Sequence, residues 1–261
     1  METHDAHRQA ADPVRFEWGP TGAAATAGDA AYAVVVDVLS FTTSVCVALE
    51  RGIVVHPFAW KDQRAEEYAA SVGATLAVGR YEARRRGGGV SLSPASIAAA
   101  PGVERLVLPS PNGSSIAAAL AAGPTVLAAC LRNRTAVATH LSDQVSLHAR
   151  RGVTSGGITV VAAGERWPDG SLRPAVEDLW GAGAVLAALV DLGMDGLSPE
   201  ARMAEAAYRS VAGDLAAAVA ACASGRELVD GGFPEDVALA AELDVANRVP
   251  ALSGGAFAHL S

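Results

Sequence analysis

The chain has 261 residues, 51% of them hydrophobic, and carries a formal net charge of −8. This length suits one large α/β domain or two tightly joined lobes. The acidic balance argues against nucleic acid or an anionic membrane as a partner. Three widely spaced cysteines, a polar N-terminus without an apolar signal segment, and no apolar run of roughly 18 residues favour a cytoplasmic protein.

Short β-branched runs alternate along the chain with longer helical patterns, which predicts an α/β fold. In chain order, strands are expected at 31–38, 53–59, 74–79, 105–110, 125–130 and 158–164, and helices at 42–52, 61–73, 94–101, 115–123 and 134–150. From Val176 onward most of the chain reads as helix. We expect one three-layer α/β/α unit over 1–261, with a mainly parallel or mixed sheet and a helical C-terminal part that could form a lobe over 195–261.

Four of these strands end in polar loops, where ligands bind in open α/β sheets. The loops contain, in order, Asp37 with Ser40, Thr42, Thr43 and Ser44; Ser110 with Asn112, Gly113, Ser114 and Ser115; Arg132, Asn133 and Arg134; and GERWPDGSLRP followed by Glu177 and Asp178. Each loop alone has a simpler explanation, because Ser, Thr and Asn cap helices and Asn-Gly forms turns. Together, hydroxyls, helix-start amides, arginines and carboxylates suit a phosphate and a hard cation.

The acids are the candidate metal ligands and catalytic groups. Asp37 ends an apolar strand, where a carboxylate is costly to bury without a partner. Its simpler role is to cap the next helix. We expect Asp37, Glu177 and Asp178 to hold Mg²⁺, and one of them, or a bound hydroxide, to activate water.

Other phosphatase and hydrolase chemistries do not match the sequence. Cys130 in CLRNRT lacks the five-residue gap to Arg that cysteine-dependent phosphatases use. Asp37-Val38-Leu39 is not the D-x-D of an aspartyl-phosphate enzyme. The chain also has no G-x-S-x-G nucleophile motif and no P-loop.

The order VVVDVLSFTTSV, LSP, SPNGS, CLRNRTAVA, VVAAG and EDLWGAG resembles the Mg²⁺-dependent 2-phosphosulfolactate phosphatases, from about Val34 to Gly255. The resemblance implies a three-layer α/β/α fold and removal of phosphate to leave 3-sulfolactate. It assigns Asp37 to the family's strand-end Asp, and Glu177 and Asp178 to its paired acids. Asn112, Gly113 and Ser114 match its Asn-Gly-Thr turn, and Asn133 matches its helix-opening Asn.

The chain departs from the family pattern at three places. Ser40 and Phe41 replace the Arg-Ala of D-V-L-R-A, Arg80 replaces the Glu of Gly-Glu, and Leu92 to Pro94 shorten Gly-Asn-Ser-Pro. Arg80 is a candidate to supply the charge missing at Ser40. The expected substrate- and phosphate-binding residues are therefore Ser40, Thr42, Thr43, Arg80, Asn112, Gly113, Ser114, Arg132 and Asn133.

These observations predict a Mg²⁺-dependent phosphatase that acts on 2-phosphosulfolactate or a related small acidic phosphate ester. The departures at Ser40 and Arg80 keep an alternative open, a non-catalytic protein that binds an anionic metabolite in the same pocket. A third, structural hypothesis uses the Ala-rich helices as subunit contacts. A homodimer is compatible with each of them.

Overall fold

The structure, a computed structural model, describes residues 4–59, 63–152 and 156–260. Within these ranges a nine-stranded mixed sheet has the order β1-β7-β2-β6-β10-β11-β3-β5-β4. Its strands are β1 (Val14–Trp18), β2 (Ala30–Val36), β3 (Val54–Phe58), β4 (Thr75–Leu76), β5 (Arg105–Pro109), β6 (Thr125–Ala129), β7 (Gly157–Ala162), β10 (Pro250–Ser253) and β11 (Ala256–His259). A separate two-stranded ribbon pairs β8 (Glu165–Arg166) with β9 (Leu172–Arg173).

The sheet consists of two parallel blocks joined by a hairpin. Strands β1, β7, β2 and β6 form one block, and β3, β5 and β4 form the other. Hairpin β10–β11 lies between the two blocks, with β10 antiparallel to β6 and β11 antiparallel to β3. Strands β3 and β6 therefore have opposite directions. Five strand-to-strand steps separate β2 from β5 in the sheet. Because each step adds a twist of about 20 to 25°, the two strand directions differ by a rotation of roughly 100 to 125°. Strong twist therefore lets the carboxyl ends of the two blocks converge.

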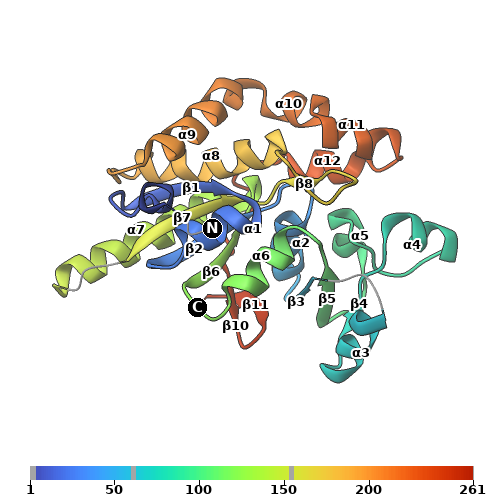
Figure 1. The fold of residues 1–261 in the computed structure, drawn as a ribbon. Coiled ribbons are helices and arrows are strands. Elements are labelled where there is room, and N and C mark those ends of the chain that lie inside the picture. Colours follow the sequence, from blue (N-terminus) through green and yellow to red (C-terminus); the bar gives the residue numbers. More distant parts are fainter. Residues whose placement is uncertain (1–3, 60–62, 153–155, 261) are drawn as a thin grey trace.

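Helices cover both faces of the sheet, as the alternation along β2 requires. Val34 and Val36 point into a core with α7, α8 and α9, whereas Ala33 and Val35 point into a second core with α1, α2 and α6. These helices are α1 (Gly19–Thr26), α2 (Phe41–Glu50), α6 (Gly113–Leu120), α7 (Arg134–Arg150), α8 (Val176–Asp191) and α9 (Pro199–Val211) (Figure 1). The predicted three-layer α/β/α architecture is confirmed.

The C-terminal part is helical only up to Ala240. Helices α10 (Leu215–Ala221), α11 (Ala223–Asp230) and α12 (Pro234–Ala240) follow α9 and lie above the sheet in Figure 1. The chain then returns to the middle of the sheet as β10 and β11, instead of continuing a helical lobe to residue 261. Gly254 and Gly255 have φ values of 57° and 82°, the positive values that a two-residue hairpin turn needs. That 1–261 forms a single domain stays a prediction.

Several elements differ from the sequence-based expectations. β1 and α1 were not expected, and the Arg- and Gly-rich loop after residue 79 begins with helix α4 (Arg80–Arg86). α4 ends where Gly87 adopts a left-handed φ of 70°. Helix α3 (Gln63–Ser71) is present, but residues 61 and 62 of that prediction lie outside the described residues. The remaining elements are α5 (Pro94–Ala99) and the 3₁₀ turns η1 (Asp5–Arg8), η2 (Leu131–Asn133) and η3 (Ala212–Asp214).

Across the described ranges, no helix has both the length and the apolar character needed to cross a membrane.

Candidate functional site

A small polar cavity of about 140 Å³ lies where β2, β5 and β7 end. Its polar lining residues are Asp37, Ser40, Ser44, Arg80, Ser110, Asn112 and Glu165. A larger hollow of about 830 Å³ lies at the opposite strand ends, where Val14 and Gly157 begin β1 and β7. We place the candidate site in the smaller cavity, because ligands bind at the carboxyl ends of parallel strands and the polar groups gather there.

Asp37 connects the end of β2 to the first residues of α2 and α6. Its side chain is 5% exposed, and its Oδ1 and Oδ2 accept hydrogen bonds from the backbone amides of Phe41 (2.9 Å) and Gly113 (3.0 Å). Burial raises the pKa of Asp37, the two amides lower it, and the charge of Glu177 raises it further. A Cβ on Gly113 would lie 2.5 Å from Phe41 Cδ1 and 2.8 Å from Asp37 Oδ2. Only glycine fits at this position.

Glu165 is a cavity residue that the sequence-based site did not include. It begins β8, directly after β7, and its Oε2 accepts a hydrogen bond from Asn112 Nδ2 at 2.9 Å. Burial raises its pKa to about 7, with a further contribution from the charge of Asp37. The signal for Glu165 was available in the sequence, because it follows a strand just as Asp37 does.

Glu177 and Asp178 are both buried in the first turn of α8, with 2% and 3% exposure. Asp178 accepts hydrogen bonds from the backbone amides of Val38 (2.7 Å) and Gly164 (2.8 Å), and so connects the ends of β2 and β7. Burial, then the charges of Asp37 and Glu177, raise the pKa of Asp178 well above its ordinary value. Cys222 Sγ donates to Glu177 at 3.3 Å. Neither acid is among the residues that line the cavity.

The close approach of α8 to the site depends on a small residue. A Cβ on Gly181 would lie 2.5 Å from Val38 and 2.8 Å from Val36, at the end of β2. Glycine at this position therefore lets the acidic first turn of α8 reach the strand end that carries Asp37.

Three predicted hydroxyl residues donate hydrogen bonds to backbone carbonyls of the protein. Thr42 Oγ1 donates to the carbonyl of Asp37 at 2.8 Å and accepts from its amide at 2.9 Å. Thr43 donates to the carbonyl of Val38, and Ser114 to the carbonyl of Phe58. These side chains shape the loops around Asp37, and none of the three lines the cavity.

Arg132 and Asn133 lie apart from the cavity, at the end of β6. Arg132 forms ion pairs with Glu50 (2.9 Å) and with Glu242. The Asn133 side chain accepts the amide of Cys130 at 2.8 Å and donates to the carbonyl of Arg248 at 3.0 Å. Both side chains therefore have partners within the protein. The twisted sheet brings together three of the four predicted loops, and the β6 loop is the exception.

Ser40 and Arg80, the two positions that depart from the family pattern, are in direct contact. Arg80 Nη2 donates to Ser40 Oγ at 2.5 Å, and Arg80 Nε forms an ion pair with Asp236 at 2.7 Å. The guanidinium charge also lowers the pKa of Asp37, although less than the effects already named. A positively charged side chain, contributed by α4, therefore lines the cavity.

The acids fit a divalent cation by their chemistry. Among the described residues, no three His, Cys, Asp or Glu side chains are already arranged around a common metal position. Burial is the largest cause of the raised pKa values of Asp37 and Asp178, and repulsion by neighbouring carboxylates adds to it. A cation would relieve this repulsion, and carboxylate oxygens are the ligands that Mg²⁺ prefers. Glu177 adds a third carboxylate to this set.

Comparison with known protein families identifies a family that covers most of the chain. A family model described as 2-phosphosulpholactate phosphatase matches residues 22–255. No curated protein matches the chain. The matched range contains all the cavity residues named above.

Proposed function

The chain belongs to the 2-phosphosulpholactate phosphatase family, and from this premise we propose that it hydrolyses 2-phosphosulfolactate, or a related small acidic phosphate monoester, with the help of Mg²⁺. Membership makes it a phosphoric monoester hydrolase. The observation that carries the proposal is the hydrogen bonding of Asp37 to Gly113 and of Asn112 to Glu165, which joins three strand ends around one cavity.

Asp37, Glu177 and Asp178 would hold the Mg²⁺. When bound, the ion would neutralise charge on the phosphoryl oxygens, which is the main requirement of phosphoryl transfer. The backbone amides on Asp37 and Asp178 fix both carboxylates before any ligand arrives. Fixed groups lose little freedom when substrate binds, which favours catalysis.

Asn112 and Ser110 would contact the phosphate. Both line the cavity, and Asn112 is the residue that precedes α6. The amino end of a helix carries partial positive charge and suits a phosphate. The Asn112 amide also holds Glu165 at 2.9 Å, so phosphate contact and proton transfer are spatially coupled.

Glu165 would act as general base. With a pKa of about 7, a substantial fraction of the carboxylate is ionised at neutral pH and can accept a proton. The water oxygen would attack phosphorus while its proton passes to a Glu165 carboxylate oxygen. The ester O–P bond breaks, its electron pair stays on the alcohol oxygen, and that oxygen takes up a proton. The products are the alcohol and inorganic phosphate.

We place this activity in the cytoplasm. The three cysteines are free and buried, which fits a reducing compartment.

The test is phosphate release from a panel of esters, including 2-phosphosulfolactate, with Mg²⁺ and with chelator. We expect Asp37→Asn to lower kcat by about 10²- to 10³-fold, corresponding to about 3 to 4 kcal/mol of lost transition-state stabilisation. Asp230→Asn, which changes an exposed carboxylate, should match the wild type. Release that is unaffected by both chelator and Asp37→Asn would contradict the proposal.

The same samples test the alternative of a non-catalytic binding protein. Thermal stabilisation by 3-sulfolactate or phosphate, with no turnover of any ester in Mg²⁺, would favour that alternative.

A further inference from the structure

We propose that Arg80 selects substrates that carry a second anionic group, a carboxylate or a sulfonate, in addition to the phosphate. This inference rests on the proposed function. It makes Arg80 a specificity-determining residue and Asp236 the residue that positions it.

Arg80 is the only arginine, lysine or histidine among the described residues that line the cavity. Its side chain is 17% exposed, so the guanidinium is largely buried but reachable. Nη2 contacts Ser40 Oγ, whose hydroxyl can also donate to the Leu92 carbonyl at 3.3 Å. Asn112, by contrast, contacts Glu165. The cavity wall thus has a cationic part at Arg80 and Ser40, and a separate amide and carboxylate part at Asn112 and Glu165.

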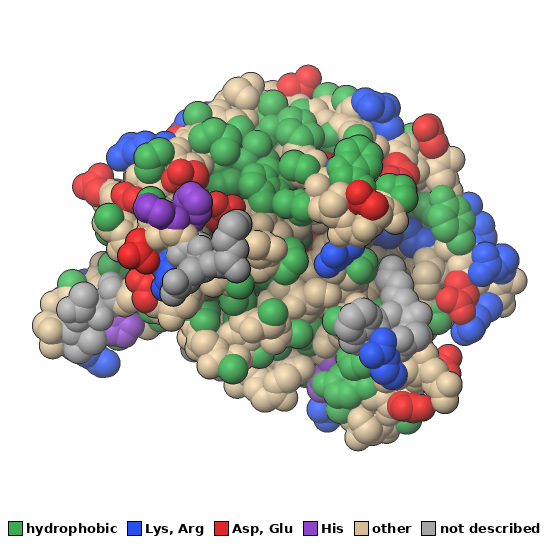
Figure 2. All heavy atoms as spheres, in the orientation of Figure 1, with side chains coloured by type: hydrophobic (Ala, Val, Ile, Leu, Met, Phe, Trp, Pro, Cys, Tyr) green, Lys and Arg blue, Asp and Glu red, His purple; other side chains and the backbone are tan. Residues whose placement is uncertain are grey.

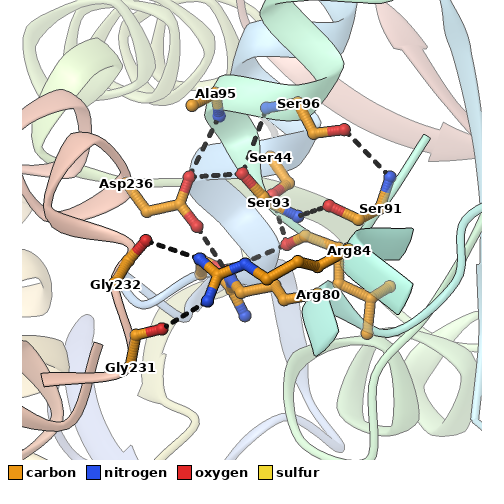
Figure 3. Close-up of polar contacts among 12 residues, drawn as sticks. Ser44, Arg80, Arg84, Ser91, Ser93, Ala95, Ser96, Gly231, Gly232 and Asp236 are labelled. Carbon is orange, nitrogen blue, oxygen red and sulfur yellow. Dashed lines mark hydrogen bonds and ion pairs between the residues drawn. The ribbon is translucent and has the colours of Figure 1, made fainter. Parts of the chain in front are cut away.

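Asp236 orients the Arg80 guanidinium through its Nε atom. It is fully buried, and its Oδ1 accepts hydrogen bonds from Ser93 Oγ (2.5 Å) and the Ala95 amide (3.1 Å). Its Oδ2 accepts from Arg80 Nε at 2.7 Å. Figure 3 shows this network between α4, the start of α5 and α12. Asp236 accepts from Arg80 Nε, and Ser40 accepts one hydrogen bond from Nη2. Each Nη carries two N–H groups, so the outer end of the guanidinium can still donate to an oxyanion such as a carboxylate or sulfonate.

A second arginine anchors α4 independently. Arg84 donates to the carbonyls of Gly231 (3.2 Å) and Gly232 (2.9 Å) and lies 4.4 Å from the centre of the Phe233 ring. Tyr81 also packs against Phe233, with ring centres 5.3 Å apart. Arg84 does not line the cavity, although it belongs to the same helix as Arg80 and contacts the segment from Gly231 to Phe233. It is therefore the matched control for Arg80.

The surface charge around α4 suits an anionic substrate. Arg85 and Arg86 are exposed in the last turn of α4, and basic side chains gather at that end of the molecule in Figure 2. The protein as a whole is acidic, with a net charge of −8. Local positive charge on an acidic protein concentrates small anions near the place where it occurs.

The test compares kcat/KM for three esters: isopropyl phosphate, phospholactate and 2-phosphosulfolactate. The first has only the phosphate, the second adds a carboxylate, and the third adds a carboxylate and a sulfonate. In Arg80→Gln, the ratio of kcat/KM for either acid-bearing ester to that for isopropyl phosphate should fall by about 10- to 100-fold. Arg84→Gln should leave this ratio within about threefold of wild type.

Asp236→Asn tests the positioning role. With Arg80 still present but less firmly oriented, KM for the acid-bearing esters should rise more than kcat falls. Arg80→Lys keeps the charge but loses the planar fork, and should recover only part of the ratio that Arg80→Gln loses. If circular dichroism shows that Arg80→Gln does not fold, Arg80→Lys carries the comparison.

Binding of 3-sulfolactate, measured by calorimetry, separates this inference from the proposed function. If the wild type hydrolyses no ester but binds 3-sulfolactate, and Arg80→Gln weakens that binding at least about tenfold more than Arg84→Gln, the phosphatase proposal fails and the role of Arg80 stands. Equal ester ratios or equal 3-sulfolactate binding in Arg80→Gln and Arg84→Gln would overturn the inference.

Discussion

Two arginines at loop positions that suggest anion binding have different surroundings. Arg132 forms ion pairs with Glu50 and Glu242, whereas among the described residues Asp236 is the single acidic partner of Arg80. Arg80 lines the cavity, and Arg132 does not. The comparison teaches that an arginine near a strand end is available to a ligand when it lines a cavity and has fewer acidic partners. The number of acidic partners distinguishes Arg80 from Arg132, whereas the residue type does not.

The largest effect on the cavity side of this comparison should come from Glu165→Gln. Loss of a general base typically costs about 10²- to 10⁴-fold in kcat, and we expect a loss in that range. Affinity for Mn²⁺, measured by electron paramagnetic resonance, should change much less than it does in Asp37→Asn. A Glu165→Gln enzyme with nearly wild-type kcat would show that the cavity does not use this carboxylate.

The second prediction concerns stability against pH in the absence of metal. The folded-state pKa of Glu165 is raised from 4.5 to about 7, so the folded protein binds the proton more tightly than the unfolded chain. Its contribution is present below about pH 4.5 and is lost as the pH rises through about 7, a change of roughly 3 kcal/mol at most. Burial, Asp37 and Glu177 oppose ionisation of Glu165, and Asn112 and Arg173 favour it.

Thermal unfolding in chelator checks this pH dependence. The stability of the wild type relative to Glu165→Gln should decrease across that window, since Gln cannot ionise. A difference that stays constant with pH would contradict the raised pKa.

The third prediction concerns the Arg132 side. Arg132→Gln should lower the free energy of unfolding by about 2 kcal/mol, because it leaves Glu50 and Glu242 without their partly exposed ion-pair partner. For a protein of this size, that loss corresponds to a melting temperature lower by roughly 4 to 8 °C. Its kcat/KM for 2-phosphosulfolactate should fall much less than that of Arg80→Gln. The opposite order of these two variants would reverse the comparison.

The smallest expected effects separate two asparagines that the sequence treats alike. Asn112→Ala should lower kcat/KM by about tenfold, since it removes the amide that holds Glu165. Asn133→Ala should instead lower the free energy of unfolding by about 1 to 2 kcal/mol, because the buried Cys130 amide loses its partner. Paired melting curves and steady-state kinetics check both. Matching profiles in the two variants would remove the distinction.

The fold was largely predictable from local patterns. Alternating β-branched and helical segments indicated the α/β layers, and the strand-end rule located Asp37 and Asn112. The central hairpin β10–β11 was not predicted, because its pairing with β6 and β3 joins segments more than 100 residues apart in sequence. No local periodicity encodes such long-range pairing.

Residue roles were harder to predict than residue positions. Thr42 and Asn133 look like ligand groups in the sequence, yet their side chains form hydrogen bonds with backbone groups of the protein. Asp236 lies 156 residues after Arg80, so only the tertiary fold reveals their ion pair. Glu165 could have been found, because it follows a strand in the same way as Asp37.

One measurement tests the central claim most directly, a crystal structure of the protein with Mn²⁺ and 3-sulfolactate. We predict anomalous density for Mn²⁺ beside the Asp37 carboxylate, and a carboxylate or sulfonate of the ligand within hydrogen-bond distance of Arg80. Arg132 should keep its ion pairs with Glu50 and Glu242. Ligand bound at Arg132, or Mn²⁺ bound away from Asp37, would contradict the account.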